Sequence, residues 1–132
     1  MDAPLFRKVD CIRLAVDDLA AAIGFYRSLG HELIWRRPSA AGLRLSESDA
    51  ELVVQTEAPG IEVDFLVDDA EQAVERFVTA GGTLVSGPFE IEIGRCVVIA
   101  DPWENTLVLL DMSHGSLPEI KGQDEPQGSA GE

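Results

Sequence analysis

The chain has few cysteines, few basic residues and no long apolar run. Cysteine occurs only at Cys11 and Cys96, each inside an apolar segment, and their spacing matches no zinc module, so we expect free buried thiols and no structural disulfide. No apolar stretch approaches the roughly 18 to 20 residues that span a bilayer, and the chain does not open with a basic segment followed by an apolar run. We therefore expect a cytoplasmic protein.

The chain has 10 basic and 24 acidic residues, which gives a formal charge of −14. Such a surface repels polyanions unless a local basic patch intervenes, and the sequence contains no such patch. Nucleic acid and anionic membranes are therefore not expected as partners. The acidity itself has two interpretations: it keeps the protein in solution, or it attracts cationic ligands to a negatively charged cleft.

What the sequence does contain is a degenerate internal repeat. Residues 16–30 return as residues 67–81, an offset of 51, with Ile23 matched by Val74 at the same offset. Repeats of this length are typical of structural units that pack on each other, because neither copy alone can bury its apolar face. We expect one domain built from two copies, with the function located where the copies meet.

Periodicity predicts the same order of elements in both halves, βαβββ. The first segment alternates like a half-buried strand, and the apolar residues after it recur every three or four positions, as in a helix that Asp17 or Asp18 can cap and Gly30 can end. The predicted strands cover residues 8–16, 31–37, 42–47 and 51–56 in the first half and 61–67, 83–86, 93–100 and 106–111 in the second, and the predicted helices cover 19–29 and 70–80.

A joint and a tail divide the chain. Ala58-Pro59-Gly60 disfavours the continuation of a helix or a central strand, so we assign residues 1–57 to the first βαβββ unit and 58–112 to the second. From residue 113 on, Gly, Pro, Ser, Gln and charged residues dominate. This composition predicts a flexible acidic tail over residues 113–132.

The repeat also serves as an alignment of candidate positions. At the offset of 51, Arg44 matches Arg95. Four extra residues then lengthen the last hairpin, so that Val53 matches Val108 at an offset of 55.

Three motifs resemble those of the vicinal oxygen chelate superfamily, which includes glyoxalases, extradiol dioxygenases, epimerases, fosfomycin-inactivating enzymes and bleomycin resistance proteins. They are the opening segment IRLAVDDLAAAIGFYRSLGHEL, the Phe25-Tyr26 pair within it, and the closing segment DPWENTLVLLD. The resemblance covers residues 8–112. It implies an α+β fold in which two tandem βαβββ units form a curled mixed sheet, a cup that holds the site, commonly with three or four metal ligands. It also implies a homodimer.

The resemblance places the four usual metal ligands at Cys11, Val53, Glu62 and Val108. Valine has no donor atom, so the usual site with two carboxylates and two imidazoles cannot form, and we expect neither a metal nor another cofactor. A register shift of two residues would bring Gln55 into the place of Val53, because both side chains point to the same face of a strand. The last strand would still lack a ligand.

Charged residues near these positions on the predicted strands suggest that the cup holds something other than a metal. Arg13 and Asp64 are related by the offset of 51, and Glu62 lies close to Asp64 in sequence. Buried charges persist when they are paired and hydrogen-bonded. One interpretation is a structural ion network that replaced the metal. The other is that Glu62 or Asp64 binds a cationic or hydrogen-bonding ligand, with Gln55 and Arg13 nearby.

Other residues complete the set of candidate ligand contacts. Trp35 and Trp103 could stack on a ligand, although each also fits a core or subunit-contact residue. Arg44 and Arg95 could orient an anionic group, although arginines at strand ends commonly pair with neighbouring acids. Glu104 stands where the family has glycine, and a positive φ at this position would cost about 1 kcal/mol.

Three functions remain open at the level of sequence. We predict a metal-free small-molecule-binding protein of the bleomycin-resistance type, which sequesters a small cationic or aromatic ligand. The alternative is a divalent-metal-dependent enzyme, a glyoxalase-like lyase or isomerase or a dioxygenase, with an unusual ligand set; an interaction module without small-molecule chemistry is the third. The sequence has no glycine-rich phosphate loop, Ser-His-Asp set or Cys-His pair to support nucleophilic catalysis.

Overall fold

The computed structural model of the chain describes residues 3–115. These residues divide into two compact units: residues 11–62 form the first, and residues 3–10 together with 63–115 form the second. No helix in residues 3–115 is both long and apolar enough to cross a membrane. The predicted tail lies outside the described residues beyond position 115.

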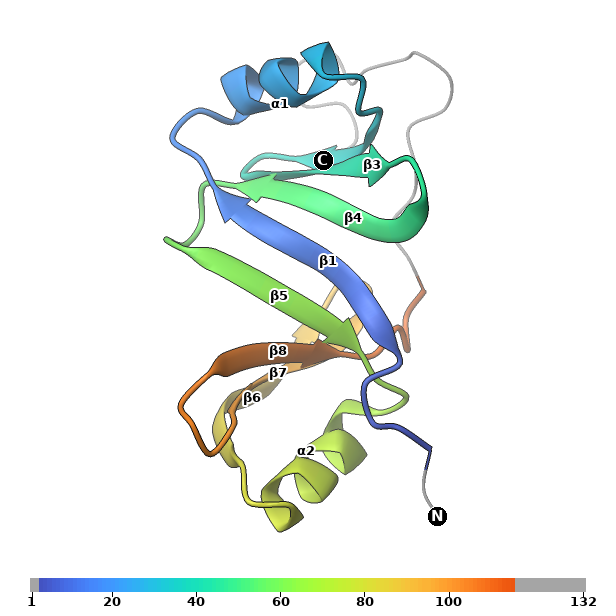
Figure 1. Cartoon of the computed structure of the whole chain (residues 1–132), viewed down its shortest axis with the longest axis vertical. Helices are drawn as coiled ribbons and strands as arrows, with labels where there is room; N and C mark the ends of the chain where they lie inside the picture. The colour runs from blue at the N-terminus through green and yellow to red at the C-terminus, as the bar shows by residue number, and fades with distance from the viewer. Residues whose placement is uncertain (1–2, 116–132) are drawn as a thin grey trace. The chain divides into compact units, whose positions relative to one another are not determined.

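The first half of the chain contains five elements in βαβββ order (Figure 1): β1 (Lys8–Ala15), α1 (Leu19–Ser28), β2 (Leu33–Arg37), β3 (Ala40–Leu45) and β4 (Ser48–Gln55). All but the first three residues of β1 belong to the first unit. Its strands lie in the order β2-β3-β4-β1. β1 and β4 are parallel, whereas β2–β3 and β3–β4 are antiparallel hairpins. The sheet is therefore mixed, because the helix serves as the connection that a parallel pair requires.

The second half repeats this order with β5 (Ile61–Leu66), α2 (Ala70–Thr79), β6 (Thr83–Ile91), β7 (Gly94–Ala100) and β8 (Thr106–Leu110). All but the first two residues of β5 belong to the second unit. Its strands lie in the order β5-β8-β7-β6, again with one parallel pair, β5–β8, and two antiparallel pairs. The predicted α+β fold with two βαβββ units is confirmed. β6 is longer than the predicted strand because Gly87 and Pro88 are accommodated at irregularities of the β6–β7 ladder and do not end it.

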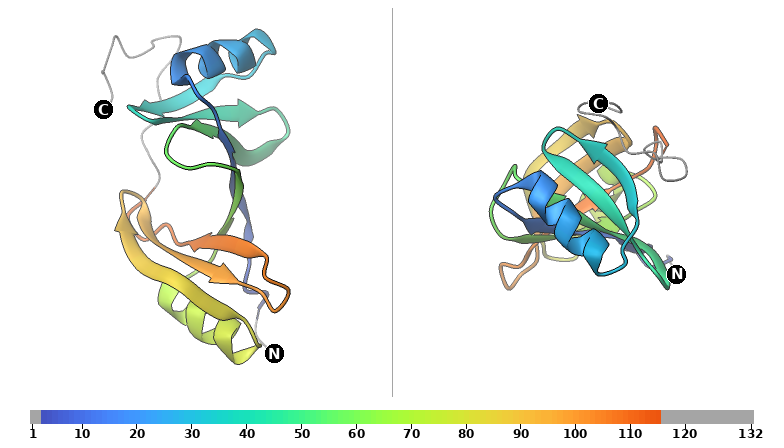
Figure 2. Two further views of the ribbon diagram at one scale, coloured as in Figure 1. Left: turned by 90° about the vertical axis from the view of Figure 1, so that its left-hand side faces the viewer. Right: turned by 90° about the horizontal axis from the view of Figure 1, so that it is seen from above.

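Each helix covers one face of its own unit's sheet (Figure 2). Asp18 caps α1 by accepting a hydrogen bond from the Ala21 amide, and Asp69 caps α2 by accepting one from Gln72. The first core is formed by Leu19, Ile23, Leu33, Ala41, Leu43 and Val54. The second is formed by Val67, Ala70, Ala73, Val97, Ile99 and Leu109. The opposite face of each sheet, which its own helix leaves uncovered, is called the helix-free face below.

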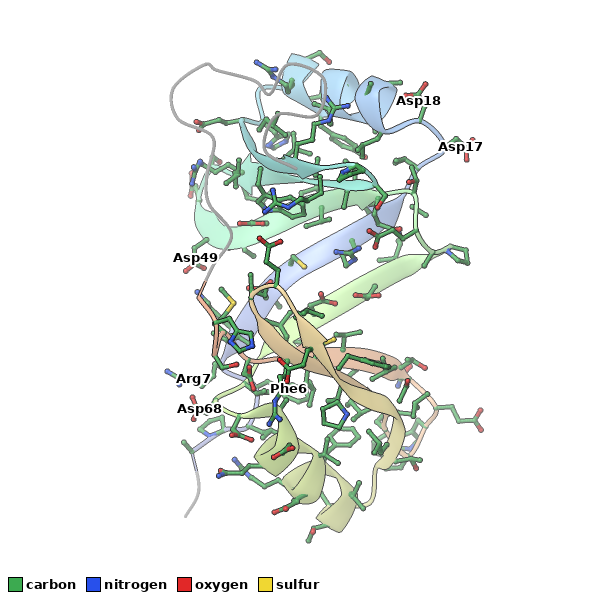
Figure 3. All side chains as sticks on the ribbon, turned by 180° about the vertical axis from the view of Figure 1, so that it is seen from behind. Phe6, Arg7, Asp17, Asp18, Asp49 and Asp68 are labelled. Carbon is green, nitrogen blue, oxygen red and sulfur yellow. The ribbon has the colours of Figure 1, made fainter. Side chains whose placement is uncertain are left out.

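The N-terminal segment packs on the second unit. The Phe6 ring stacks on Phe65 with centroids 4.6 Å apart, and the Arg7 amide donates to the Leu66 carbonyl at 2.8 Å. The Arg7 guanidinium also forms an ion pair with Asp68 (Figure 3). These contacts explain why residues 3–10 belong to the unit formed by the second half of the chain.

The strand registers show how the two copies correspond. In the first unit Arg13 pairs with Val53, Val53 with Gly42, and Gly42 with Trp35. In the second unit Asp64 pairs with Val108, Val108 with Val98, and Val98 with Ser86. The two rows occupy equivalent places. They confirm that Arg13 corresponds to Asp64 and Val53 to Val108.

The predicted match of Arg44 with Arg95 is wrong. Since Gly42 corresponds to Val98, the residue equivalent to Arg44 is Ala100. The extra residues of the second copy therefore lie in the β6–β7 hairpin, before Arg95, and not after it. The alignment failed because two arginines coincided by chance at the offset that holds for the helices.

The turn between β7 and β8 has the positive φ expected at Glu104, with a value of 72°. The Asp101 carboxylate holds this turn by accepting hydrogen bonds from the amides of Trp103 and Asn105 and from Asn105 Nδ2. The side-chain bond from Asn105 is the largest of the causes that lower the pKa of Asp101. The turn is thus fixed by the Asp101 carboxylate although one of its residues is strained.

Replacing Glu104 with glycine should raise the free energy of unfolding by about 0.5 to 1 kcal/mol, because glycine adopts a positive φ without steric strain and loses part of that gain to its more flexible unfolded state. Urea denaturation of wild type and variant would measure the gain. Glu104→Ala is the matched control, since alanine keeps the strain. An equal gain in both variants would show that loss of the Glu104 charge, and not φ, is responsible.

Candidate functional site

Most of the predicted contacts of the first half lie on the helix-free face of the first unit. Paired residues of neighbouring strands point to the same side of a sheet, and the core pairs Val54–Ala41 and Leu52–Leu43 point toward α1. The alternating residues therefore point away from the helix. They form three rows: Cys11, Glu51 and Arg44; Arg13, Val53, Gly42 and Trp35; and Ala15, Gln55, Ala40 and Arg37.

Arg13 is at the centre of an ion network. Its Nη2 lies 2.9 Å from Glu57 Oε1, and its Nε lies 3.6 Å from Glu62 Oε2. The second oxygen of Glu57 accepts a hydrogen bond of 2.7 Å from Ser39 Oγ. The Arg13 side chain is only 20% exposed, whereas Glu57 and Glu62 are 50% and 39% exposed. The guanidinium is thus neutralised by two carboxylates that both reach solvent.

The side-chain amide of Gln55 is hydrogen-bonded to the loop that follows β4. Its Oε1 accepts hydrogen bonds from the amides of Glu57 and Ala58, at 2.6 and 2.8 Å, and its Nε2 donates to the Ala58 carbonyl at 2.7 Å. The side chain is buried, with an exposed fraction of 2%. It positions Glu57 beside Arg13, and a metal bound to its Oε1 would have to displace these bonds.

Trp35 packs over Gly42 and holds Glu51. The indole Nε1–H donates to Glu51 Oε1 at 2.7 Å. A Cβ atom on Gly42 would meet the indole ring, so glycine leaves the space that the ring fills. Trp35 is 7% exposed and belongs to the buried part of the unit. It therefore positions the Glu51 carboxylate on the same face as Arg13.

The residues present do not fit the metal that the resemblance implies. Val53 is 1% exposed and pairs with Arg13, and Val108 pairs with Asp64, so two of the four places offer only methyl groups. Cys11 is buried, and the carboxylate of Glu62 faces the Arg13 guanidinium. Within residues 3–115 no three His, Cys, Asp or Glu side chains are grouped so that they could hold a metal ion.

The candidates of the second unit lie in separate places. Asp64 is buried on the helix-free face, with an exposed fraction of 5%. Arg95 Nη1 instead reaches Glu71 on α2, at 3.1 Å, which places it on the helix side of the sheet. This hydrogen bond is the largest of the causes that raise the pKa of Arg95. Trp103 lies in the β7–β8 turn and is 78% exposed.

Arg44 lies near the end of β3, and its side chain is 44% exposed. It pairs across β3 and β4 with Glu51, and its Nε lies 3.0 Å from Glu32 Oε1. The structure thus brings Arg13, Trp35, Gln55 and Arg44 to one face, with Glu62 joined to them through Arg13.

Three residues of this site were missed in the sequence. Glu51 could have been found, because it alternates with Val53 and Gln55 along one strand. Ser39 and Glu57 lie in turns, where the approach to Arg13 depends on how the backbone folds. Local sequence patterns do not predict that these two residues lie close to Arg13.

Asp111 is a further residue that the sequence did not single out. Its buried carboxylate accepts hydrogen bonds from the amides of Ala70, Arg95 and Ser113 and from the Ser113 hydroxyl. Burial acts to raise the pKa of Asp111, but these hydrogen bonds outweigh burial and lower it. Asp111 therefore joins the end of β8 to the starts of α2 and β7 as a structural residue.

Solved structures with the same fold include several enzymes. Methylmalonyl-CoA epimerase from Mycobacterium tuberculosis is 22% identical with a TM-score of 0.70, covering 86% of this chain and 93% of its own. The epimerase from Streptomyces coelicolor is 19% identical with a TM-score of 0.67, covering 87% of this chain and all of its own. The 2,3-dioxygenase LapB from Pseudomonas sp. KL28 is 18% identical with a TM-score of 0.64, and the match covers 92% of this chain and 46% of LapB.

These likenesses show the fold alone, because every identity is below a quarter. No curated protein matches the chain. The family model for the Glyoxalase/Bleomycin resistance protein/Dioxygenase superfamily matches residues 8–109, which contain all eight strands but the last residue of β8. The chain belongs to the glyoxalase/bleomycin resistance protein/dioxygenase superfamily.

Proposed function

We propose that the protein binds a small cationic or aromatic molecule without a metal, and that the helix-free face of the first unit contributes the cation contact. The observation that carries this proposal is the ion network of Arg13, Glu57 and Glu62 beside a strand position where valine replaces a ligand residue. With valine at this position and charged side chains beside it, the face offers a ligand electrostatic contacts in place of metal donors. The homodimer implied by the resemblance remains part of the proposal.

The charge balance favours a cation over an anion. Arg13 faces two carboxylates, a third at Glu51 lies on the same face, and the whole chain carries −14. A negative field raises the local concentration of cations and repels anions. One solved structure with this fold holds methylmalonyl-CoA. A CoA ester is polyanionic, so we do not propose one as the ligand here.

Thermal unfolding in the presence of candidate ligands tests the proposal. We expect stabilisation by benzamidinium, an aromatic amidinium, or by a cationic bleomycin-type glycopeptide, and none by nickel, manganese, iron or zinc ions. A ligand at 100 times its dissociation constant raises the stability by about 2.7 kcal/mol, which is readily measured. Stoichiometric metal bound through Glu62 would contradict the proposal and support a metal-dependent enzyme.

Replacing Glu62 with glutamine should weaken binding of the cation about tenfold, because the side chain keeps its shape but loses the charge that the cation needs. Isothermal titration calorimetry with the wild type and variant measures the loss. Glu47→Gln, in the exposed β3–β4 turn of the same unit, removes the same charge as a control and should leave the affinity unchanged. Asp64→Asn tests separately whether the buried carboxylate of the second unit contributes.

A further inference from the structure

We propose that Arg13 is an internal counter-ion, which competes with a cationic ligand for Glu62 and stays on Glu57 when the ligand binds. The inference rests on the proposed function, and it adds the chemical class of the ligand group: a compact ammonium, amidinium or guanidinium. It reverses the usual expectation for an arginine in a binding site, because Arg13 then lowers affinity.

The two carboxylates hold Arg13 unequally. The 2.9 Å contact with Glu57 is a charge-assisted hydrogen bond, whereas the 3.6 Å contact with Glu62 is too long for one. Within residues 3–115 the Arg13 contact is the only polar contact of the Glu62 carboxylate. Glu62 is therefore the partner that Arg13 can release at the lower energetic cost.

Hydrogen bonds hold Glu57 in a position where it can retain the Arg13 guanidinium. Its second carboxylate oxygen accepts a hydrogen bond from the Ser39 hydroxyl, and its backbone amide donates to Gln55 Oε1. The Thr56 amide adds a bond of 2.9 Å to the Ser39 carbonyl, so the loop is tied to the β2–β3 turn as well. The Ser39 hydroxyl orients the Glu57 carboxylate, and the backbone bonds hold the loop that carries it. Arg13 can therefore keep one carboxylate while it gives up the other.

The contact between Arg13 and Glu62 also indicates which ligand group can replace Arg13 at Glu62. A guanidinium nitrogen already lies 3.6 Å from a carboxylate oxygen that is partly exposed to solvent. A ligand cation that approaches from solvent can come closer than 3.6 Å and donate a hydrogen bond, which Arg13 does not. The gain of that hydrogen bond favours the ligand over the internal cation.

Removing the charge of Arg13 should therefore tighten the binding of a cation. We expect Arg13→Met to bind benzamidinium about fivefold more tightly than wild type, since an ion pair of this exposure contributes up to about 1 kcal/mol and 1.4 kcal/mol corresponds to tenfold. Methionine keeps much of the aliphatic length of the side chain. Benzoate, which has the same shape and the opposite charge, should bind neither protein measurably.

A double-mutant cycle tests the unequal roles of the two carboxylates. Glu57→Gln should weaken benzamidinium binding in the wild-type background, because Arg13 then pairs with Glu62 alone. The same substitution should weaken binding less in the Arg13→Met background, where there is no internal cation to hold and only the loss of one negative charge remains. Arg27→Gln, in the last turn of α1, removes a positive charge from another part of the first unit and controls for net charge.

The outcomes separate the inference from the function. Benzamidinium binding that is unchanged or weaker in Arg13→Met would overturn the counter-ion role and leave the proposed function intact. Tighter binding of equal size in Arg27→Gln would also overturn it, since net charge would then explain the gain. Failure of benzamidinium and the cationic glycopeptide to bind either protein would overturn the proposed function, and the inference with it.

Discussion

Replacing Asp111 with alanine should lower the free energy of unfolding by about 3 kcal/mol, because a buried donor left without an acceptor costs about 1 to 3 kcal/mol and several donors lose theirs. Among the groups that lose a partner are the amide of Ala70, which is fully buried, and the amide of Arg95. Urea denaturation of both proteins measures the difference. Asp17→Ala removes an exposed carboxylate and should change the stability little.

Replacing Asp111 with asparagine, which removes the charge and keeps the shape, should change how the free energy of unfolding depends on pH. The pKa of Asp111 is lower in the folded protein than its ordinary value of 3.8, so its carboxylate stabilises the fold fully above that value. The stabilisation is lost as the pH falls through the folded pKa. The difference in the free energy of unfolding between wild type and Asp111→Asn should therefore become smaller below about pH 4. A gap that stays constant through this range would contradict the ionised carboxylate as its source.

Replacing Gly42 with alanine should destabilise the protein by about 2 kcal/mol, in the range found for extra atoms forced into a packed core. The added methyl group would lie 2.5 Å from Cε2 and 2.8 Å from Cδ1 of Trp35, so the indole must move and its hydrogen bond to Glu51 must lengthen. In a Trp103→Phe background the remaining tryptophan fluorescence reports Trp35 alone. We expect its emission to shift to the red.

The control for this prediction is the removal of the ring. In a Trp35→Ala background the same Gly42→Ala change should have almost no effect, because the space occupied by the indole is then empty. An equal loss of stability in both backgrounds would show that the backbone of β3, and not the ring, requires glycine at this position. Urea denaturation of the four proteins gives the comparison.

The elements of the fold could be predicted because their signals are local. The cap at Asp18, the positive φ of Gly30 and the spacing of apolar residues in α1 lie within one segment of chain. Alternation along β4 likewise needs only neighbouring residues. Pairing between strands is not local, and one identical residue at a fixed offset could not establish it. The mismatch of Arg44 and Arg95 is the result.

The candidate site could be predicted only in part, for a related reason. The sequence pointed to Arg13 and Glu62 as charged residues on equivalent strands, and the structure pairs them with each other. The role of Gln55 as a loop clamp depends on the backbone amides after β4, which no residue pattern records. The burial of Asp111 depends on three segments meeting, whereas in sequence it resembles any acidic residue at the end of a strand.

The N-terminal segment packs with the second half of the chain. The boundaries of the sequence repeat and of the packed unit therefore fall at different residues. Cutting the gene at the repeat boundary would separate Leu5 and Phe6 from the core that they cover beside Phe65. A fragment that begins at residue 58 would thus present a bare apolar patch. An experimenter who wishes to study one copy alone, or to rebuild the protein from two identical copies, should carry residues 3–10 along with the second half.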